Sequence, residues 1–171
     1  MSSIQIGEGF VGSGPNAAHV NTVLGDRSGP VGVAWATALA TPRTGHVPFM
    51  AIAQTGIAVT PLTLFVNKAP IENDAHGNLT WGAAQAGLAS GVSDALKAGV
   101  LKEESVDDLV LIAAMWINPT AHDEEEVYAN NRQAVFDALS NGAKNLPKVK
   151  EFLQAAENVA NPFFRQHQDS K

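Results

Sequence analysis

The sequence predicts an α/β fold, a single domain in which helices pack on one mixed β-sheet. Two stretches near the N-terminus alternate between apolar and polar residues, as strands do. Nine consecutive apolar residues, Leu109–Ile117, are typical of a central strand. Residues 79–98 carry an apolar stripe at helical spacing. The 171 residues suit one domain with a substantial core, which we expect to extend over residues 1–171.

The composition argues against several classes of protein. A formal net charge of -6 disfavours nucleic acid and anionic membranes as partners. Without cysteine there is no disulfide or thiolate chemistry, and the five histidines show no metal-binding spacing, so no metal site is expected. We find no signal-peptide pattern and no apolar run of about 18 residues, and therefore expect a soluble, cytoplasmic protein. The charged fraction of 16% is low, which predicts that other subunits cover part of the surface.

The first half of the chain predicts a hairpin, a helix and two further strands. Residues 4–12 and 17–25 alternate as strands, and the turn-forming residues between them favour a hairpin. Pro30 suits the first turn of a helix that ends at Ala40. Two apolar segments, 47–53 and 62–66, are then expected as strands, and residues 73–78 as a polar loop.

The second half predicts a helix, a buried strand and two more helices. The stripe of the 79–98 helix consists of Trp81, Gln85, Leu88, Val92 and Leu96, and Gly99 suits its end. The run Leu109–Ile117 is expected to be buried on both faces of the sheet. Asp123 and Glu126 form a helix-capping pattern, and the acidic run between them fits the helix dipole better than a metal. Residues 147–158 are expected as the last helix.

His19 is the first candidate for chemistry. In a strand, His19 and Asn21 project from the same face of the pleat. An imidazole that titrates near neutral pH, with an amide two residues on, suits acid–base catalysis. A hydrogen-bonded structural histidine is the alternative that the spacing leaves open.

Gln85 and Lys68 are two further candidates. Gln85 lies on the apolar stripe of its helix, where an unpartnered amide would be costly, so it bonds either to a backbone group of the sheet or to a ligand. Lys68 follows the apolar strand 62–66, where an exposed lysine at a strand end is the ordinary alternative to a functional one.

Several short motifs, taken in order, resemble the formaldehyde-activating enzyme family over residues 6–163. That family condenses formaldehyde with tetrahydromethanopterin. No single motif is specific, but their order and spacing together are. The motifs are Gly7-Glu8, Val11-Gly12, Ala18-His19, Gly25-x-Arg27-x-x-Pro30, Phe65-x-Asn67-Lys68, Gly82-x-Ala84-Gln85-x-Gly87, Asp107-Asp108-Leu109 and Pro162-Phe163.

The resemblance implies a function, a fold and an assembly. It implies a hydro-lyase of one-carbon metabolism and formaldehyde detoxification, with tetrahydromethanopterin as co-substrate and no bound cofactor. His19 would be the general acid, oriented by Asn21, while Lys68 and Gln85 would bind the pterin. Met50 falls where the family has a leucine that contacts the pterin. The implied fold is ribosomal protein S5 domain 2-like, and the implied assembly is a homo-oligomer, typically a pentameric ring with active sites between subunits.

The chain departs from the family pattern at three positions. The family has an aspartate at Asn21, a threonine at Pro70 and a histidine at Ala86. Asparagine keeps the shape of aspartate and loses its charge, and proline removes a hydroxyl and a backbone N–H. These departures predict a divergent paralogue. The alternatives are a non-catalytic relative that binds formaldehyde, a pterin or another metabolite as sensor or carrier, and a purely structural ring subunit.

Overall fold

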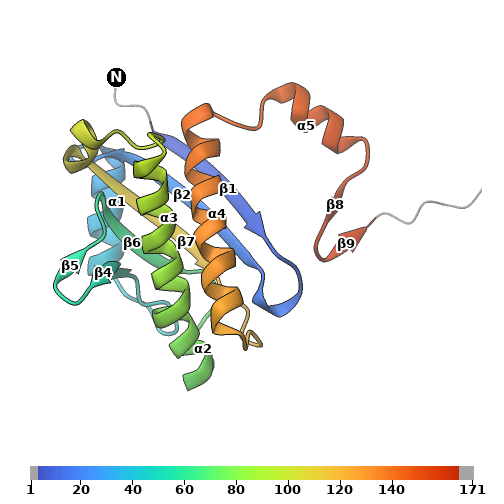
Figure 1. The fold of residues 1–171 in the computed structure, drawn as a ribbon, viewed down its shortest axis with the longest axis horizontal. Helices are drawn as coiled ribbons and strands as arrows, with labels where there is room; N and C mark the ends of the chain where they lie inside the picture. The colour runs from blue at the N-terminus through green and yellow to red at the C-terminus, as the bar shows by residue number, and fades with distance from the viewer. Residues whose placement is uncertain (1–3, 166–171) are drawn as a thin grey trace, which may run out of the picture.

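A five-stranded mixed sheet forms the centre of the molecule (Figure 1). A computed structural model describes residues 4–165. Strands β6 and β7 pair in parallel, and every other neighbouring pair in this sheet is antiparallel. The predicted α/β class and mixed sheet are therefore confirmed. In spatial order the strands are β1 (Gln5–Val11), β2 (Ala18–Asp26), β7 (Leu109–Trp116), β6 (Leu62–Asn67) and β3 (Phe49–Met50).

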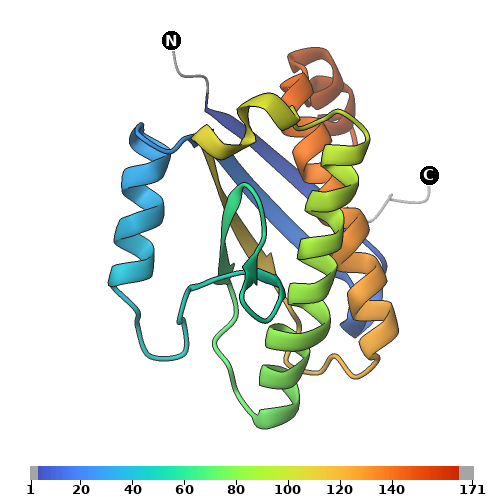
Figure 2. The same cartoon turned by 60° about the vertical axis from the view of Figure 1, so that its left-hand side comes forward.

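Helices cover both faces of this sheet. Helices α3 (Gln85–Lys97) and α4 (Glu124–Lys144) lie side by side on one face, and α1 (Pro30–Ala40) lies on the other (Figure 2). The main core fills the space between the sheet and the α3–α4 pair, and its largest fully buried members include Phe65, Leu88, Leu111, Met115 and Val135.

The N-terminal hairpin and the first helix are confirmed. Every residue of β1 pairs with β2, and the two strands are joined by a short 3-10 turn, η1 (Gly14–Asn16). Helix α1 begins at Pro30, as predicted, because the missing N–H of proline costs nothing in a first turn. The hairpin register sets Glu8 opposite Asn21 and Phe10 opposite His19.

Strand β7 is central, as predicted, but it is not equally buried on its two faces. Leu111, Ala113 and Met115 point toward α3 and α4 and are fully buried. Their alternate neighbours Ile112, Ala114 and Trp116 are only half-buried. The difference arises because, in the described chain, only α1 covers the face with Ile112, Ala114 and Trp116, whereas both α3 and α4 cover the opposite face. The half-buried face is the part of the sheet with room for chemistry.

The expected polar loop at residues 73–78 is wrong, because these residues belong to helix α2 (Asp74–Leu79). Asn73 caps the helix by accepting a hydrogen bond from the His76 N–H at 2.9 Å. His76 is buried, with Nε2 3.0 Å from the Ile117 carbonyl oxygen. A π-helical turn, η2 (Thr80–Ala84), continues into α3, so the predicted 79–98 helix is confirmed with an irregular first turn. Gly99 ends it in a left-handed conformation.

The segment predicted as one strand over 47–53 is two short strands. The chain leaves the sheet edge at buried Ala51, whose N–H donates to Thr63 and whose carbonyl accepts from Val59. Strand β4 (Ile52–Gln54) then pairs with β5 (Ile57–Ala58) in a separate hairpin.

The C-terminal segment extends away from the body of the molecule (Figure 1). A 3-10 segment, η3 (Glu103–Asp108), precedes β7, and Asp123 caps α4 through the Glu126 N–H, as predicted. The predicted last helix is present as α5 (Val149–Ala156), none of whose residues is buried. A minimal hairpin of β8 (Ala160–Asn161) and β9 (Phe164–Arg165) follows.

Among residues 4–165, none of the helices combines the length and the apolar character that crossing a bilayer requires.

Candidate functional site

His19 and Asn21 lie on the half-buried face of the sheet, on strand β2. Neighbouring strands add further side chains to the same face, because residues paired across a sheet share a face. His19 pairs with Phe10 on β1 and with Trp116 on β7, and Asn21 pairs with Glu8. The Phe10 and His19 rings lie 5.7 Å apart. His19 therefore has an aromatic residue on each side.

Lys68 joins this group from the end of β6. Its backbone N–H donates to the Met115 carbonyl at 2.8 Å, which continues the pairing of β6 with β7. The side chain then crosses the sheet face, so that Nζ donates to Asn21 Oδ1 at 2.7 Å and lies 3.4 Å from His19 Nδ1. Lys68 is half-buried. The alternative of an exposed lysine at a strand end is therefore wrong.

Glu8 completes the group, and the sequence analysis missed it. Its Oε1 lies 3.2 Å from His19 Nε2, so the imidazole stands between a carboxylate and an amine. The hairpin register was the available signal. Once Phe10 faces His19, Glu8 must face Asn21 and lie diagonal to His19 on the same side of the pleat.

Burial and neighbouring charge set the protonation of this group. The pKa of His19 is lowered from its usual value of 6.5, first by burial and then by the Lys68 charge, while Glu8 opposes the shift. Burial also lowers the pKa of Lys68, again against the effect of Glu8. The group thus offers an imidazole that can exchange protons and an amine that is more easily deprotonated than a surface lysine.

Gln85 makes a structural pair of hydrogen bonds. Its Oε1 accepts from the Ile52 N–H of β4 at 3.0 Å, and its Nε2 donates to the Trp81 carbonyl at 2.6 Å. The alternative of a bond to a strand backbone group is confirmed. Gln85 and Met50 nonetheless line one apolar pocket at the sheet edge, together with Val47, Phe49, Ile52 and Trp81.

The structure does not bring these two groups together within one chain. His19, Asn21 and Lys68 lie on the sheet face, whereas Met50 and Gln85 lie at its β3 edge. Strands β7 and β6 separate β2 from β3, so three interstrand spacings place the two strands roughly 14 Å apart. Within the described residues, no side-chain hydrogen bond joins the two groups.

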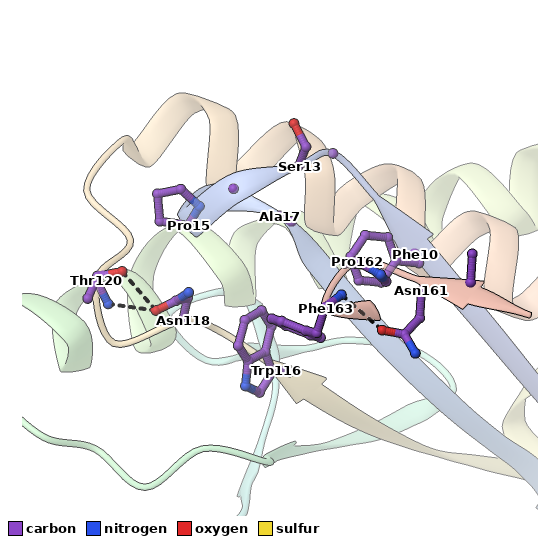
Figure 3. Close-up of a pocket in the computed structure, with 13 residues that line it drawn as sticks. Phe10, Ser13, Pro15, Ala17, Trp116, Asn118, Thr120, Asn161, Pro162 and Phe163 are labelled. Atoms are coloured by element: carbon purple, nitrogen blue, oxygen red, sulfur yellow. Dashed lines mark hydrogen bonds between the residues drawn. The ribbon is translucent and has the colours of Figure 1, made fainter. Parts of the chain in front are cut away.

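Figure 3 shows a second pocket, which is lined by Phe10 and Trp116, the two residues that pair with His19 across the sheet. It lies between the β1–β2 turn, the end of β7 and the C-terminal segment, and Phe10 and Trp116 form part of its wall. The Phe163 ring meets Trp116 edge-on, with ring centroids 6.2 Å apart. The pocket wall therefore combines three aromatic rings with small residues, prolines and the amides of Asn118 and Asn161.

The described residues hold no cluster of three or more His, Asp or Glu side chains arranged to bind a metal ion. The site itself contributes an imidazole, a carboxylate, an amine and an amide.

Comparison with known proteins identifies relatives over almost the whole chain. A family profile described as "Formaldehyde-activating enzyme (Fae)" matches residues 6–164. A 5,6,7,8-tetrahydromethanopterin hydro-lyase of Methanosarcina barkeri is 39% identical over 158 residues, which cover 92% of this chain and 89% of that protein. A bifunctional enzyme Fae/Hps of Methanosphaerula palustris is 33% identical over 91% of this chain. The match spans 40% of that longer protein. A bifunctional enzyme Fae/Hps of Archaeoglobus fulgidus is 31% identical, and the match again spans 40% of the longer protein.

Proposed function

This chain belongs to the formaldehyde-activating enzyme family, and we propose from this premise that it condenses formaldehyde with tetrahydromethanopterin or a related reduced pterin. It would thus act as a carbon–oxygen hydro-lyase in one-carbon metabolism, with a cytoplasmic location. The observation that carries the proposal is the position of His19, whose two ring nitrogens face Glu8 and Lys68 on an open face of the sheet.

The proposed reaction needs one well-placed proton. An amine nitrogen of the pterin adds to formaldehyde and gives a carbinolamine, whose hydroxyl must be protonated before it leaves as water. His19 is the proposed donor, and the Glu8 carboxylate stabilises the protonated imidazole. The second pterin nitrogen then closes the methylene bridge. Holding both reactants together supplies much of the remaining acceleration.

Substrate binding is proposed to use both groups of residues. Lys68 and Asn21 would contact the polar reacting end, and the apolar pocket with Met50 and Gln85 would hold the pterin ring. Because the two groups are separated within one chain, we propose that a neighbouring subunit completes each site. A homo-oligomer, as a pentameric ring, agrees with the low charge content and with the exposed apolar residues of α5.

The proposed function has a direct test. The chain is mixed with formaldehyde and tetrahydromethanopterin, and formation of the methylene adduct is followed by absorbance. We expect a rate above the uncatalysed background that His19→Ala returns to background. The matched control is His122→Gln, because the His122 side chain is exposed and makes no hydrogen bond to His19, Asn21 or Lys68. A wild-type rate equal to background would refute the enzymatic function.

A non-catalytic relative is the second candidate, and Asn21 is the observation that favours it. Asn21 carries no charge beside Lys68. It therefore does not favour the protonated forms of the site's basic groups, as an aspartate at this position would. A sensor or carrier would bind formaldehyde or the pterin and show no turnover. Isothermal titration alongside the absorbance assay separates the two, since binding without an increased rate identifies the carrier.

A further inference from the structure

The side chain of Lys68 has an unusual set of partners. Its Nζ contacts two groups that carry no negative charge, Asn21 Oδ1 at 2.7 Å and His19 Nδ1 at 3.4 Å. Among residues 4–165, no carboxylate lies within salt-bridge distance of this amine. The charge of the Glu8 carboxylate raises the pKa of Lys68. That carboxylate pairs with Nε2 of His19, whereas Lys68 lies beside Nδ1.

These partners make the Lys68 amine easier to deprotonate than a surface lysine. The side chain is half-buried, and burial disfavours an ammonium ion. Two cations 3.4 Å apart would repel each other, so the site disfavours an ammonium on Lys68 beside a protonated His19. The titratable groups that face Lys68 are His19 from β2 and Glu8 from β1.

A neutral lysine amine adds to an aldehyde and forms a Schiff base. We propose that Lys68 Nζ captures formaldehyde covalently and passes its carbon to the pterin, with His19 moving the protons. This inference rests on the proposed function and deepens it, since Lys68 becomes a catalytic residue rather than a binding contact.

Capture and transfer need only bond exchanges and proton transfers, with His19 protonated at the start. The Nζ lone pair forms a bond to the formaldehyde carbon and the carbonyl π pair moves to oxygen; His19 gives its Nδ1 proton to that oxygen and takes one from Nζ, which gives a carbinolamine. The protonated His19 then donates to the hydroxyl, water leaves, and an iminium remains on Nζ. A pterin amine adds to the iminium carbon, and a proton moves from that amine to Nζ. The Nζ–carbon bond breaks to free the neutral lysine and leaves an iminium on the first pterin nitrogen. The second pterin nitrogen adds to that iminium carbon, closes the bridge and passes its proton to His19, which restores the starting state. No oxidation or reduction takes place.

The geometry assigns distinct tasks to the two neighbours. His19 Nδ1 faces Nζ and can therefore reach a hydroxyl carried on the captured carbon, while Nε2 faces the stabilising carboxylate of Glu8. Asn21 is a positioning residue, because its Oδ1 orients Nζ without adding a charge that would favour the ammonium ion.

Reductive trapping tests the capture step. The wild-type chain is incubated, without pterin, with less than one equivalent of ¹³C-formaldehyde and with cyanoborohydride, which reduces an iminium to a stable methylamine. Peptide mass mapping then gives the label at each lysine. We expect the label at Lys68 to exceed that at Lys102, an exposed lysine directly before η3, by several-fold. Equal labelling of the two would overturn the proposal.

Substitutions separate capture from charge-based binding. Lys68→Arg keeps a cation and Lys68→Met removes it, and neither can form the iminium, so kcat should fall to background in both. If Lys68 only bound substrate, Lys68→Arg would mainly raise KM and keep kcat, which would contradict capture. Asn21→Asp places a carboxylate on Nζ, so trapping at neutral pH should fall several-fold and recover as pH rises. Unchanged trapping in Asn21→Asp would show that a neutral amine is not the reacting form.

The two proposals fail in different ways. Trapping at Lys68 with no acceleration of the condensation would refute the enzymatic function and leave capture standing, as in a formaldehyde carrier. Acceleration without selective trapping would refute capture and leave the function standing. Lys102→Arg is the matched control in both assays and should behave as the wild type.

Discussion

Lys68 reaches across strand β7 to place its Nζ 3.4 Å from Nδ1 of His19, 49 residues earlier in the chain. The contact exists because β6 pairs in parallel with β7, while β2 pairs with the other edge of β7. The side chain of a lysine is long enough to pass over the half-buried face between them. An imidazole and an amine in contact can exchange a proton directly.

Glu8→Gln should lower the pKa of His19 further. The Glu8 carboxylate raises that pKa, both by its charge and by its hydrogen bond to the ring, and the amide of glutamine carries no charge. The measurement is an NMR titration of the His19 imidazole in the variant and the wild type. The control is Glu103→Gln, at an exposed position in η3. A His19 titration curve unchanged in Glu8→Gln would show that the 3.2 Å pair does not form in solution.

His19 should make the fold less stable at acidic pH. Its pKa in the folded chain lies below the unfolded value of 6.5, so as pH falls the unfolded chain takes up the proton first. The free energy of unfolding therefore decreases as pH drops through 6.5 toward the pKa of His19 in the folded chain. Below that pKa, the contribution of His19 to the free energy of unfolding no longer changes with pH. His19→Gln should lose less stability than the wild type between about pH 7.5 and about pH 5.5, measured by urea denaturation. An equal or larger loss in the variant would contradict the predicted lowering of the pKa of His19 in the folded chain.

Mixed oligomers should recover activity if two subunits share each site. His19→Ala and Met50→Glu would each be inactive alone, because each damages one of the two separated groups. In a one-to-one mixed ring, half of the subunits carry an intact His19 group and the other half carry an intact Met50 group. A shared site is complete only where a subunit of the first kind has one of the second kind on the correct side, which holds for about one quarter of the sites. We expect about that fraction of the wild-type rate after co-expression. Sedimentation must show mixed oligomers, and mixed rings without activity would indicate a site within one chain.

Gly9→Ala should destabilise the fold strongly. A Cβ at Gly9 would lie 2.1 Å from the Ala134 carbonyl oxygen of α4, which is backbone and cannot move aside. We expect a loss of about 3 kcal/mol, at the upper end of the usual cost of overpacking, measured by chemical denaturation. Gly82→Ala is the matched control, since nothing lies within 4 Å of its added methyl group and alanine favours a helix. Equal stability of the two variants would contradict the close packing of β1 on α4.

The sequence predicted the elements whose signals are local. The hairpin, the start of α1 at Pro30, the end of α3 at Gly99 and the cap of α4 at Asp123 each depend on a few neighbouring residues. The polar segment 73–78 was misjudged because its stability as a helix comes from burying His76 against Ile117, a contact 41 residues away. The sequence predicts one strand over residues 47–53, but the structure has two, because the chain leaves the sheet at buried Ala51.

The sequence by itself determined that His19 and Asn21 share one face of a strand, because alternation of side chains is a property of any extended backbone. Only the tertiary structure decided that Glu8 and Lys68 meet His19 there and that Met50 and Gln85 do not. Those relations depend on strand order and register, which are set by packing of the whole core against α3 and α4. His19, Asn21 and Lys68 could therefore be named from the sequence, but the place of Glu8 beside them, the contacts of the group and the chemistry proposed for Lys68 come from the fold.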